Sequence, residues 1–224
     1  LFLLHPVCVE SVAWISEQKN TLSLVFYLLA VLAYLRFDQN RRGANYAGAT
    51  LLFLLALGSK TVTASLPAAL LVIFWWQRGR LEWRRDVLPL LPWFGLSVAA
   101  GITTAWFEHV LINDGYDYEL DFLQRSLLAS RAIWFYATKF LLPINLIFVY
   151  PRWTIDAATW WQWLFPLGIV LLGCAAWRWR HHRGPIAAGF FFAGSLFPAL
   201  GFVNVYPFVF SFVADHFQYL ASLG

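Results

Sequence analysis

Polar side chains are few in this chain, and they gather in short clusters beside long apolar stretches. The first cluster, HPVCVESVAWISEQKN, places His5 and Glu10 five residues apart across Pro6, which can start a helix. A histidine and a carboxylate at such a position could position a hydroxyl group, move a proton or contribute to a metal site. One of each is too few to hold a metal ion alone. A structural kink beside a snorkelling carboxylate is the alternative.

Three cations in two further segments have the chemistry to bind a phosphate group. Lys60 lies in the segment SKTVTASLP, where neighbouring Ser and Thr hydroxyls add hydrogen-bond donors. Arg125 and Arg131, followed by Lys139, share one broad side of a predicted helix, and guanidinium groups suit bidentate recognition of phosphate or pyrophosphate. The alternatives are a lysine that extends to lipid headgroups and arginines that bind anionic lipids without specificity.

The last cluster, ADHFQYLASLG, follows the final apolar segment. It contains Asp215, His216, Gln218 and Tyr219, and on a helix Asp215 and Tyr219 would share a face because they are four residues apart. We expect these side chains to belong to the same solvated outer face as the first cluster.

Residues 17–20 of the first cluster are predicted to cap the helix that follows them.

One loop, NDGYDYELDFLQR, is rich in acidic residues. Its Asp114, Asp117, Glu119 and Asp121 could bind Ca²⁺, but they lack the spacing of a known calcium loop, which favours a solvated loop. We therefore predict no metal site from the sequence, and a divalent cation is left open as a cofactor.

The composition is typical of an integral membrane protein. The chain has 224 residues, of which 60% are hydrophobic and only 12% charged, against roughly 25% charged residues in an average soluble domain. The formal charge of +4 could suit nucleic acid in a soluble protein, but here the arginines lie between apolar segments, so a nucleic-acid partner is not expected. We expect the sequence to be an internal fragment that lacks residues at both ends.

Apolar stretches predict an all-α, polytopic membrane bundle. Six segments are long enough to cross or nearly cross a bilayer: 21–35, 46–57, 62–76, 87–105, 161–177 and 185–205. A seventh stretch, 127–149, is interrupted by charges and a proline. The pattern predicts about six crossings and one re-entrant or interfacial segment within a single domain, 1–224.

The basic residues give the bundle an orientation. Ten of the sixteen Lys and Arg residues lie in the three loops that follow residues 35, 76 and 177, together with three acids. If these loops are cytoplasmic, the polar clusters face the other side, and 127–149 cannot make a net crossing. Trp153 and Trp161 are read as part of an aromatic belt at the membrane surface.

Four blocks of the sequence together resemble one family. HPVCVESVAWISEQKNTLSLVFYLLAVLAYLRF, SKTVTASLPAALLVIFWW, RSLLASRAIWFYATKFLLPINLIFVYPRW and SFVADHFQYLASLG are similar, in that order, to blocks of the transmembrane and tetratricopeptide-repeat-containing O-mannosyltransferases. These are multi-span enzymes of the GT-C superfamily, with bacterial relatives. Lys19–Asn20, Lys60–Thr61 and His216–Phe217 replace the Arg-Asp, Lys-Pro and Arg-Tyr of the family, departures that fit a bacterial branch.

The resemblance implies a function for the polar clusters. Such enzymes are inverting glycosyltransferases that move a sugar, here mannose-like, from a polyprenyl-phosphate donor to a hydroxyl of a protein or glycan on the extracytoplasmic face. A bacterial inner membrane would be the location. The resemblance implies that Lys60, Arg125 and Arg131 bind the donor phosphate, and that His5 and Glu10 shape the catalytic pocket. The catalytic base of the superfamily, an acidic residue, lies in a loop that precedes the first matching block.

Three other functions fit the same sequence. A non-enzymatic membrane anchor or partner-binding module would tolerate replacement of Lys60 or Glu10. A transporter for a lipid-linked sugar would need charged residues along a path on both sides, whereas the inner loops resemble arginine anchors. A lipid-linked glycan ligase differs only in its acceptor.

Overall fold

The computed structural model describes residues 2–107, 110, 120–202 and 206–224. In this part of the chain all regular secondary structure is helical and no strand occurs, which confirms the predicted all-α class. The chain divides into two compact units. The hairpin unit is Val9–Thr104, and the C-terminal unit combines Leu1–Cys8 with Ala105–Gly224.

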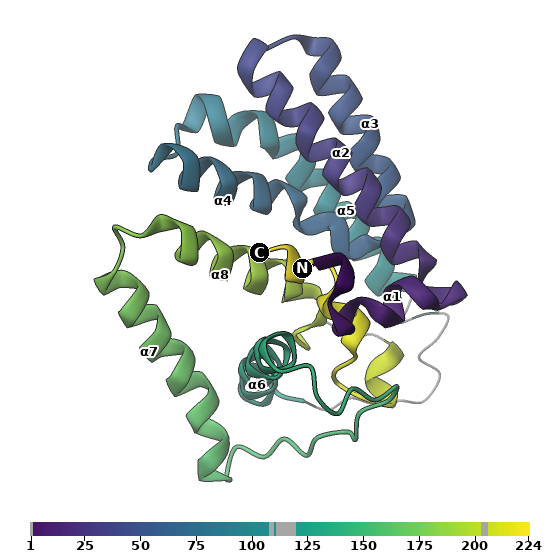
Figure 1. Cartoon of the computed structure of the whole chain (residues 1–224), viewed down its shortest axis with the longest axis vertical. Helices are drawn as coiled ribbons and strands as arrows, with labels where there is room; N and C mark the ends of the chain where they lie inside the picture. The colour runs from purple at the N-terminus through teal and green to yellow at the C-terminus, as the bar shows by residue number, and fades with distance from the viewer. Residues whose placement is uncertain (1, 108–109, 111–119, 203–205) are drawn as a thin grey trace. The chain divides into compact units, whose positions relative to one another are not determined.

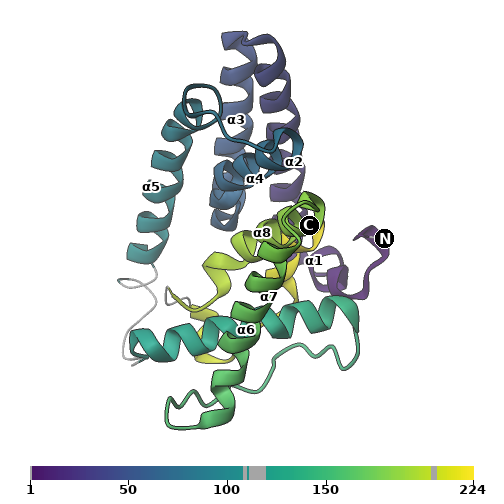
Figure 2. The same cartoon turned by 90° about the vertical axis from the view of Figure 1, so that its left-hand side faces the viewer.

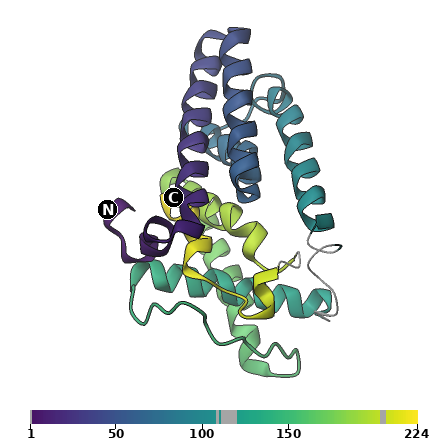
Figure 3. The ribbon, with the colours of Figure 1, turned by 90° about the vertical axis from the view of Figure 1, so that its right-hand side faces the viewer.

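The hairpin unit is built around two long antiparallel helices. It contains α1 (Val9–Ala13), α2 (Gln18–Asn40), α3 (Gly43–Ser59), α4 (Leu66–Arg78) and α5 (Leu91–Phe107) as far as Thr104. Figures 1 and 3 show α2 and α3 side by side along their lengths. The chain turns between them at Arg41, whose φ of 52° places it in the left-handed region that ends many helices.

Small and aromatic side chains alternate in the core of the hairpin unit. Ala30 of α2 and Ala49 of α3 are fully buried, which lets the two backbones approach closely. Trp93 of α5 is also fully buried; its ring stacks on Phe53 at 4.6 Å, and its Nε1–H donates to the Thr50 hydroxyl at 3.0 Å. The indole therefore joins α5 to α3 by both stacking and a hydrogen bond.

The C-terminal unit contains α6 (Phe122–Leu141), α7 (Leu164–Arg178) and α8 (Arg183–Leu196), followed by short 3₁₀ turns. Asp121 caps α6: its side chain accepts from the Gln124 backbone N–H, and the Gln124 side chain accepts from the Asp121 N–H. Figure 2 shows α7 crossing α6. At this crossing the indole of Trp134 lies over Gly168, where a larger residue would collide with it.

Three described helical segments are long and apolar enough to cross a membrane: Ile15–Asn40, Trp83–Phe107 and Trp160–Arg178. They contain the predicted segments 21–35, 87–105 and 161–177. The segment 46–57 falls within α3, a shorter apolar helix of 17 residues. Three segments thus meet the length requirement, and the remaining crossings of the predicted six stay predictions.

Two predicted segments differ from the observed helices. The segment 185–205 is not one helix, because α8 ends at Leu196, just before a turn that contains Pro198. Its 14 residues would extend only about 21 Å, less than the roughly 30 Å of a bilayer core. The segment 127–149 is helical only as far as Leu141 and irregular beyond it.

Candidate functional site

Lys60, the lysine of the SKTVTASLP block, ends α3 and points toward the start of α2. Its backbone N–H bonds to the Ala56 carbonyl at 2.9 Å, which fixes the helix end. Its ammonium group donates to the Asn20 side-chain oxygen and lies 3.9 Å from Glu17 Oε2. Two of the four sequence blocks therefore meet within the hairpin unit.

The partners of Lys60 form a buried polar cluster. Asn20 donates to the Ser11 hydroxyl at 3.0 Å and to Glu17 Oε2 at 2.8 Å, and these three side chains are all buried. Lys19 pairs with the other Glu17 oxygen at 3.3 Å. The predicted cap at residues 17–20 is wrong in this respect: Glu17 makes no capping bond to the helix and holds two ammonium groups instead.

Burial changes the acidity of Lys60. Desolvation lowers the pKa of its ammonium group from 10.5 to about 8; Glu17 opposes this shift, and Lys19 adds to it. The side chain is therefore a cation close to its titration range, already satisfied by an amide and a carboxylate. A phosphate would have to compete with Glu17 for it.

Arg131 occupies a different environment, an aromatic cage in the C-terminal unit. Its guanidinium carbon lies 4.2 Å from the ring centre of Trp153, 5.4 Å from that of Trp161 and 5.8 Å from that of Phe165. Cation–π attraction of this kind stabilises the positive charge over the ring faces. Burial lowers the pKa of the guanidinium, which nevertheless stays protonated at neutral pH.

The cage is held in place by its surroundings. The Trp134 Nε1–H donates to the Phe165 carbonyl at 3.0 Å, which fixes the start of α7 against α6. Buried Gln162 donates to the Thr154 carbonyl and accepts from the Asp156 N–H, each at 3.2 Å, which ties the Trp153 segment to the same helix start. The rings are thus positioned before any ligand arrives.

The donors of Arg131 remain available. Within the described residues its guanidinium makes cation–π contacts and no hydrogen bond or ion pair. A guanidinium has five N–H donors in its plane, which can bond to water or to a bound anion. An anion that binds these donors would form charge-assisted hydrogen bonds with them.

Arg125 differs from Arg131 in its role. Its Nε–H donates to the Leu120 carbonyl at 3.0 Å, and one Nη donates to the Gly201 carbonyl at 2.8 Å. Lys139 is also occupied, because its ammonium group donates to the carbonyls of Ile144 and Asn145. Both cations therefore hold loops of the C-terminal unit together.

His5 is engaged through both ring nitrogens. Its Nε2 lies 2.9 Å from the Phe140 carbonyl, and its Nδ1 accepts from the Val7 N–H at 3.4 Å. These bonds require the tautomer with the proton on Nε2, and the ring stacks on Phe140 at 4.9 Å. The imidazole fixes the N-terminal segment against the end of α6.

Glu10 lies half-buried in the first turn of α1 and belongs to the hairpin unit. Lys60 belongs to the same unit, whereas His5, Arg125 and Arg131 belong to the C-terminal unit. The expectation that Lys60, Arg125 and Arg131 bind the donor phosphate, and that His5 and Glu10 shape the catalytic pocket, stays a prediction.

The cluster ADHFQYLASLG is buried rather than solvated. Asp215 and Gln218 are at most 1% exposed, Tyr219 is 6% exposed, and His216 is half-buried. These residues lie in and beside a 3₁₀ turn (Asp215–Gln218), so the predicted shared helical face of Asp215 and Tyr219 is wrong. The neighbouring Val213 and Ala221 belong to the hydrophobic core of the unit, and their burial brings the polar residues between them into the protein interior.

No group of three metal-ligating side chains occurs among the described residues. Asp121 of the acidic loop caps α6, while Asp114, Asp117 and Glu119 lie outside the residues that the structure describes. The divalent cation remains an open cofactor.

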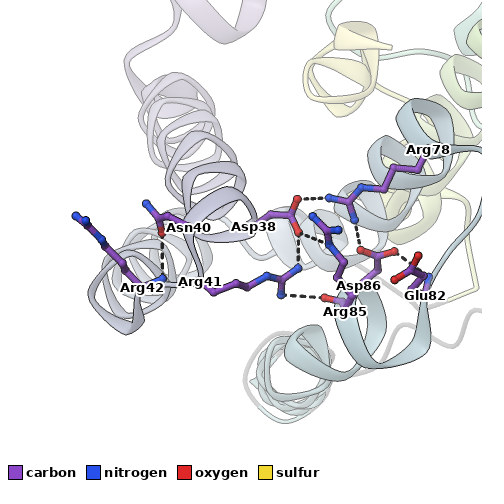
Figure 4. A network of polar contacts seen from close by, with 8 residues as sticks. All are labelled: Asp38, Asn40, Arg41, Arg42, Arg78, Glu82, Arg85 and Asp86. Carbon is purple, nitrogen blue, oxygen red and sulfur yellow. Dashed lines mark hydrogen bonds and ion pairs between the residues drawn. The ribbon is translucent and has the colours of Figure 1, made fainter.

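A second polar network closes the opposite end of the hairpin unit (Figure 4). Arg78 of α4 pairs with Asp38 of α2 and with Asp86, and both carboxylates are buried. Arg41 adds a bond to Asp38 at 2.6 Å, and Arg85 lies 3.5 Å from the same carboxylate. Two of the three basic loops, read from the sequence as plain arginine anchors, are thus also internal braces.

The sequence did not reveal the aromatic cage or the Glu17–Asn20 cluster, although it singled out Arg131 and Lys60. Of the three predicted phosphate ligands, Arg131 alone keeps its hydrogen-bonding edge unoccupied within the described residues. The Arg131 cage is therefore the arrangement with the clearest binding chemistry. Comparison of the chain with protein-family models, curated proteins and solved structures finds no match.

Proposed function

We propose that the chain is part of a membrane glycosyltransferase that moves a mannose-like sugar from a polyprenyl-phosphate donor to a protein or glycan hydroxyl. The active face lies on the extracytoplasmic side, in a bundle of about six crossings, in a bacterial inner membrane. The three membrane-length helices support the membrane location. The resemblance of the four sequence blocks supports the reaction.

One observation carries the proposal: the guanidinium carbon of Arg131 lies between 4.2 and 5.8 Å from the centres of three rings, while its N–H groups have no acceptor among the described residues. Phosphate oxygens match the spacing of guanidinium donors, and aromatic surroundings strengthen such bonds by excluding water. Arg131 is thus the ligand for the donor phosphate. Arg125 positions the 201–202 segment. The expected part of Lys60 in binding the donor phosphate stays a prediction.

The proposed reaction requires a cation beside the phosphate that leaves. The acceptor hydroxyl attacks the anomeric carbon, the bond from that carbon to the phosphate oxygen breaks, and the polyprenyl phosphate leaves with the electron pair. The hydroxyl proton passes to a carboxylate, which the resemblance assigns to a loop before the first block. Negative charge develops on the phosphate as it leaves, and a fixed guanidinium stabilises that charge.

Binding of the leaving group tests the role of Arg131. The full chain in lipid nanodiscs would be titrated with farnesyl phosphate and with a polyprenyl-phosphate mannose. Arg131→Gln is expected to weaken both about tenfold or more, the loss that follows from one charge-assisted hydrogen bond, while Arg131→Lys is expected to weaken them less. Farnesol without phosphate should bind equally to all variants.

Arg180→Gln is the matched control, because Arg180 is an exposed arginine that lies over a single ring, that of Trp177. Unchanged phosphate affinity of Arg131→Gln would overturn the assignment of this residue. Absence of phosphate-dependent binding in the parent chain would count against the glycosyltransferase and favour the anchor or partner-binding module.

A further inference from the structure

An exposed apolar loop begins at the last residue of α6, and the name covers residues 141–149. Six of its nine side chains are large hydrophobic groups that are between 44% and 75% exposed: Leu141, Leu142, Ile144, Ile147, Phe148 and Val149. Large apolar side chains that are exposed together along one short segment are unfavourable in water, which favours a contact with another apolar phase.

The backbone of the apolar loop is fixed although its side chains are exposed. The Lys139 ammonium group donates to the carbonyls of Ile144 at 2.7 Å and Asn145 at 3.0 Å. Asn145 adopts a left-handed conformation with φ 52°, which turns the chain. The Ile147 N–H donates to the hydroxyl of Tyr150, which lies at the base of the loop and is buried. The loop is therefore a built structure that presents its apolar side chains outward.

The two flanks of the loop carry cations above aromatic rings. Lys139 lies 5.2 Å from the ring centre of Tyr150, and exposed Arg152 lies 4.9 Å from that of Phe212. Further along the same connection, Trp160 is 74% exposed. At a membrane surface, apolar side chains enter the lipid, while neighbouring cations contact headgroup phosphates and tryptophans lie at the boundary. The loop and its flanks follow this pattern.

The irregular backbone limits how deep the loop can lie. Peptide groups without regular hydrogen bonds do not occur in contact with lipid inside the hydrocarbon core, so a deep position is excluded. We propose that residues 141–149 insert into the phospholipid bilayer at the boundary between headgroups and acyl chains, about 5–10 Å below the surface. This inference concerns the surface of the C-terminal unit and does not depend on the proposed reaction.

Depth-dependent quenching tests the proposal. The full chain with Cys174→Ala, which removes the exposed cysteine, would receive Phe148→Cys and be labelled with an environment-sensitive fluorophore; Cys8 is buried. In phosphatidylcholine–phosphatidylglycerol vesicles, we expect a blue-shifted emission that lipids with a nitroxide near the headgroup quench more strongly than lipids with a nitroxide at the chain end. Ile144→Cys should behave in the same way.

His181→Cys is the matched control, since His181 is exposed in a polar loop. Its label should stay accessible to aqueous iodide and be quenched weakly by either lipid. Quenching of the Phe148 label by iodide alone would overturn the proposal. Shielding from both iodide and lipid quenchers would also overturn it, because a protein surface would then cover the loop.

Discussion

The Tyr150 hydroxyl lies 3.0 Å from each carboxylate oxygen of Asp215. Both side chains are buried, and they come from segments 65 residues apart. The same hydroxyl accepts from the Ile147 N–H at 3.4 Å. The contact therefore joins the base of the apolar loop to the ADHFQYLASLG block within the C-terminal unit.

Tyr150→Phe removes this hydroxyl without changing the shape of the ring. The Asp215 carboxylate then loses a donor inside the protein, and we expect the free energy of unfolding to fall by about 1–3 kcal/mol. Urea or thermal unfolding in detergent micelles, followed by intrinsic fluorescence, measures the loss. Asp215→Asn and the double variant complete a thermodynamic cycle, and a coupling free energy near zero would show that the bond contributes nothing to stability.

The lowered pKa of Lys60 predicts that the free energy of unfolding rises at alkaline pH. Its pKa is about 8 in the folded chain against the ordinary 10.5, so between these values the unfolded chain binds more protons than the folded one. The free energy of unfolding must therefore increase as pH rises through this window, by an amount on the order of 3 kcal/mol. Below pH 8 both states are protonated and this contribution is constant.

The measurement compares thermal midpoints of the parent chain and Lys60→Met from pH 7 to pH 10. The parent should gain stability relative to the variant as pH rises, because the methionine has no proton to lose. Lys19→Met, at a lysine with a 51% exposed side chain, serves as the control and should follow the parent. A constant difference between parent and Lys60→Met would contradict the prediction.

Asp86→Asn is expected to be strongly destabilising. Asp86 is fully buried and pairs with the half-buried Arg78, so the substitution removes one of the two carboxylates of this cation from a buried network, at a cost of about 3–5 kcal/mol. Glu82→Gln is the matched control, because Glu82 pairs with Arg80 at 3.2 Å on the surface, where a pair contributes about 0–1 kcal/mol. Equal losses in the two variants would show that the Figure 4 network does not brace the unit.

Gly168→Ala tests the crossing of α6 and α7. A Cβ at this position would lie 2.8 Å from Cζ2 of Trp134, so the indole must shift or the helices must separate, at a cost of about 1–3 kcal/mol. At Gly173, on the same helix, a Cβ meets nothing within 4 Å. Gly173→Ala should be neutral or stabilising through helix propensity, and thermal unfolding of both variants decides the matter.

The helices were largely predictable because apolar runs bounded by arginines and glycines determine them locally. The segment 46–57 lies within α3, and 87–105 overlaps α5 closely. The segment 185–205 is the exception, because it contains Pro198, which ends the helix. The hydropathy averaged over the whole apolar run does not reveal the effect of this one residue. The irregular end of 127–149 has the same origin: the run stays apolar after the helix has stopped at Leu141.

The sequence indicated which residues belong to the site but not how they are arranged. Lys60 and Arg131 were recognised as cations in apolar surroundings, but their partners depend on tertiary packing. Asn20 lies 40 residues before Lys60 and meets it only because α2 and α3 are antiparallel. The Arg131 rings come from the loop after α6 and the start of α7, where tryptophans are equally typical of an aromatic belt.

The Arg131 cage also restricts the direction from which a ligand can arrive. Three rings lie around the guanidinium carbon, with centres 4.2, 5.4 and 5.8 Å from it, and the N–H rim of the flat group is the part that offers hydrogen bonds to a ligand. Such a rim selects by geometry as well as by charge: it admits groups that offer two oxygens in one plane and disfavours compact anions that interact equally from every side. Halide ions should therefore compete poorly at this position with a phosphate ester or a carboxylate of the same charge.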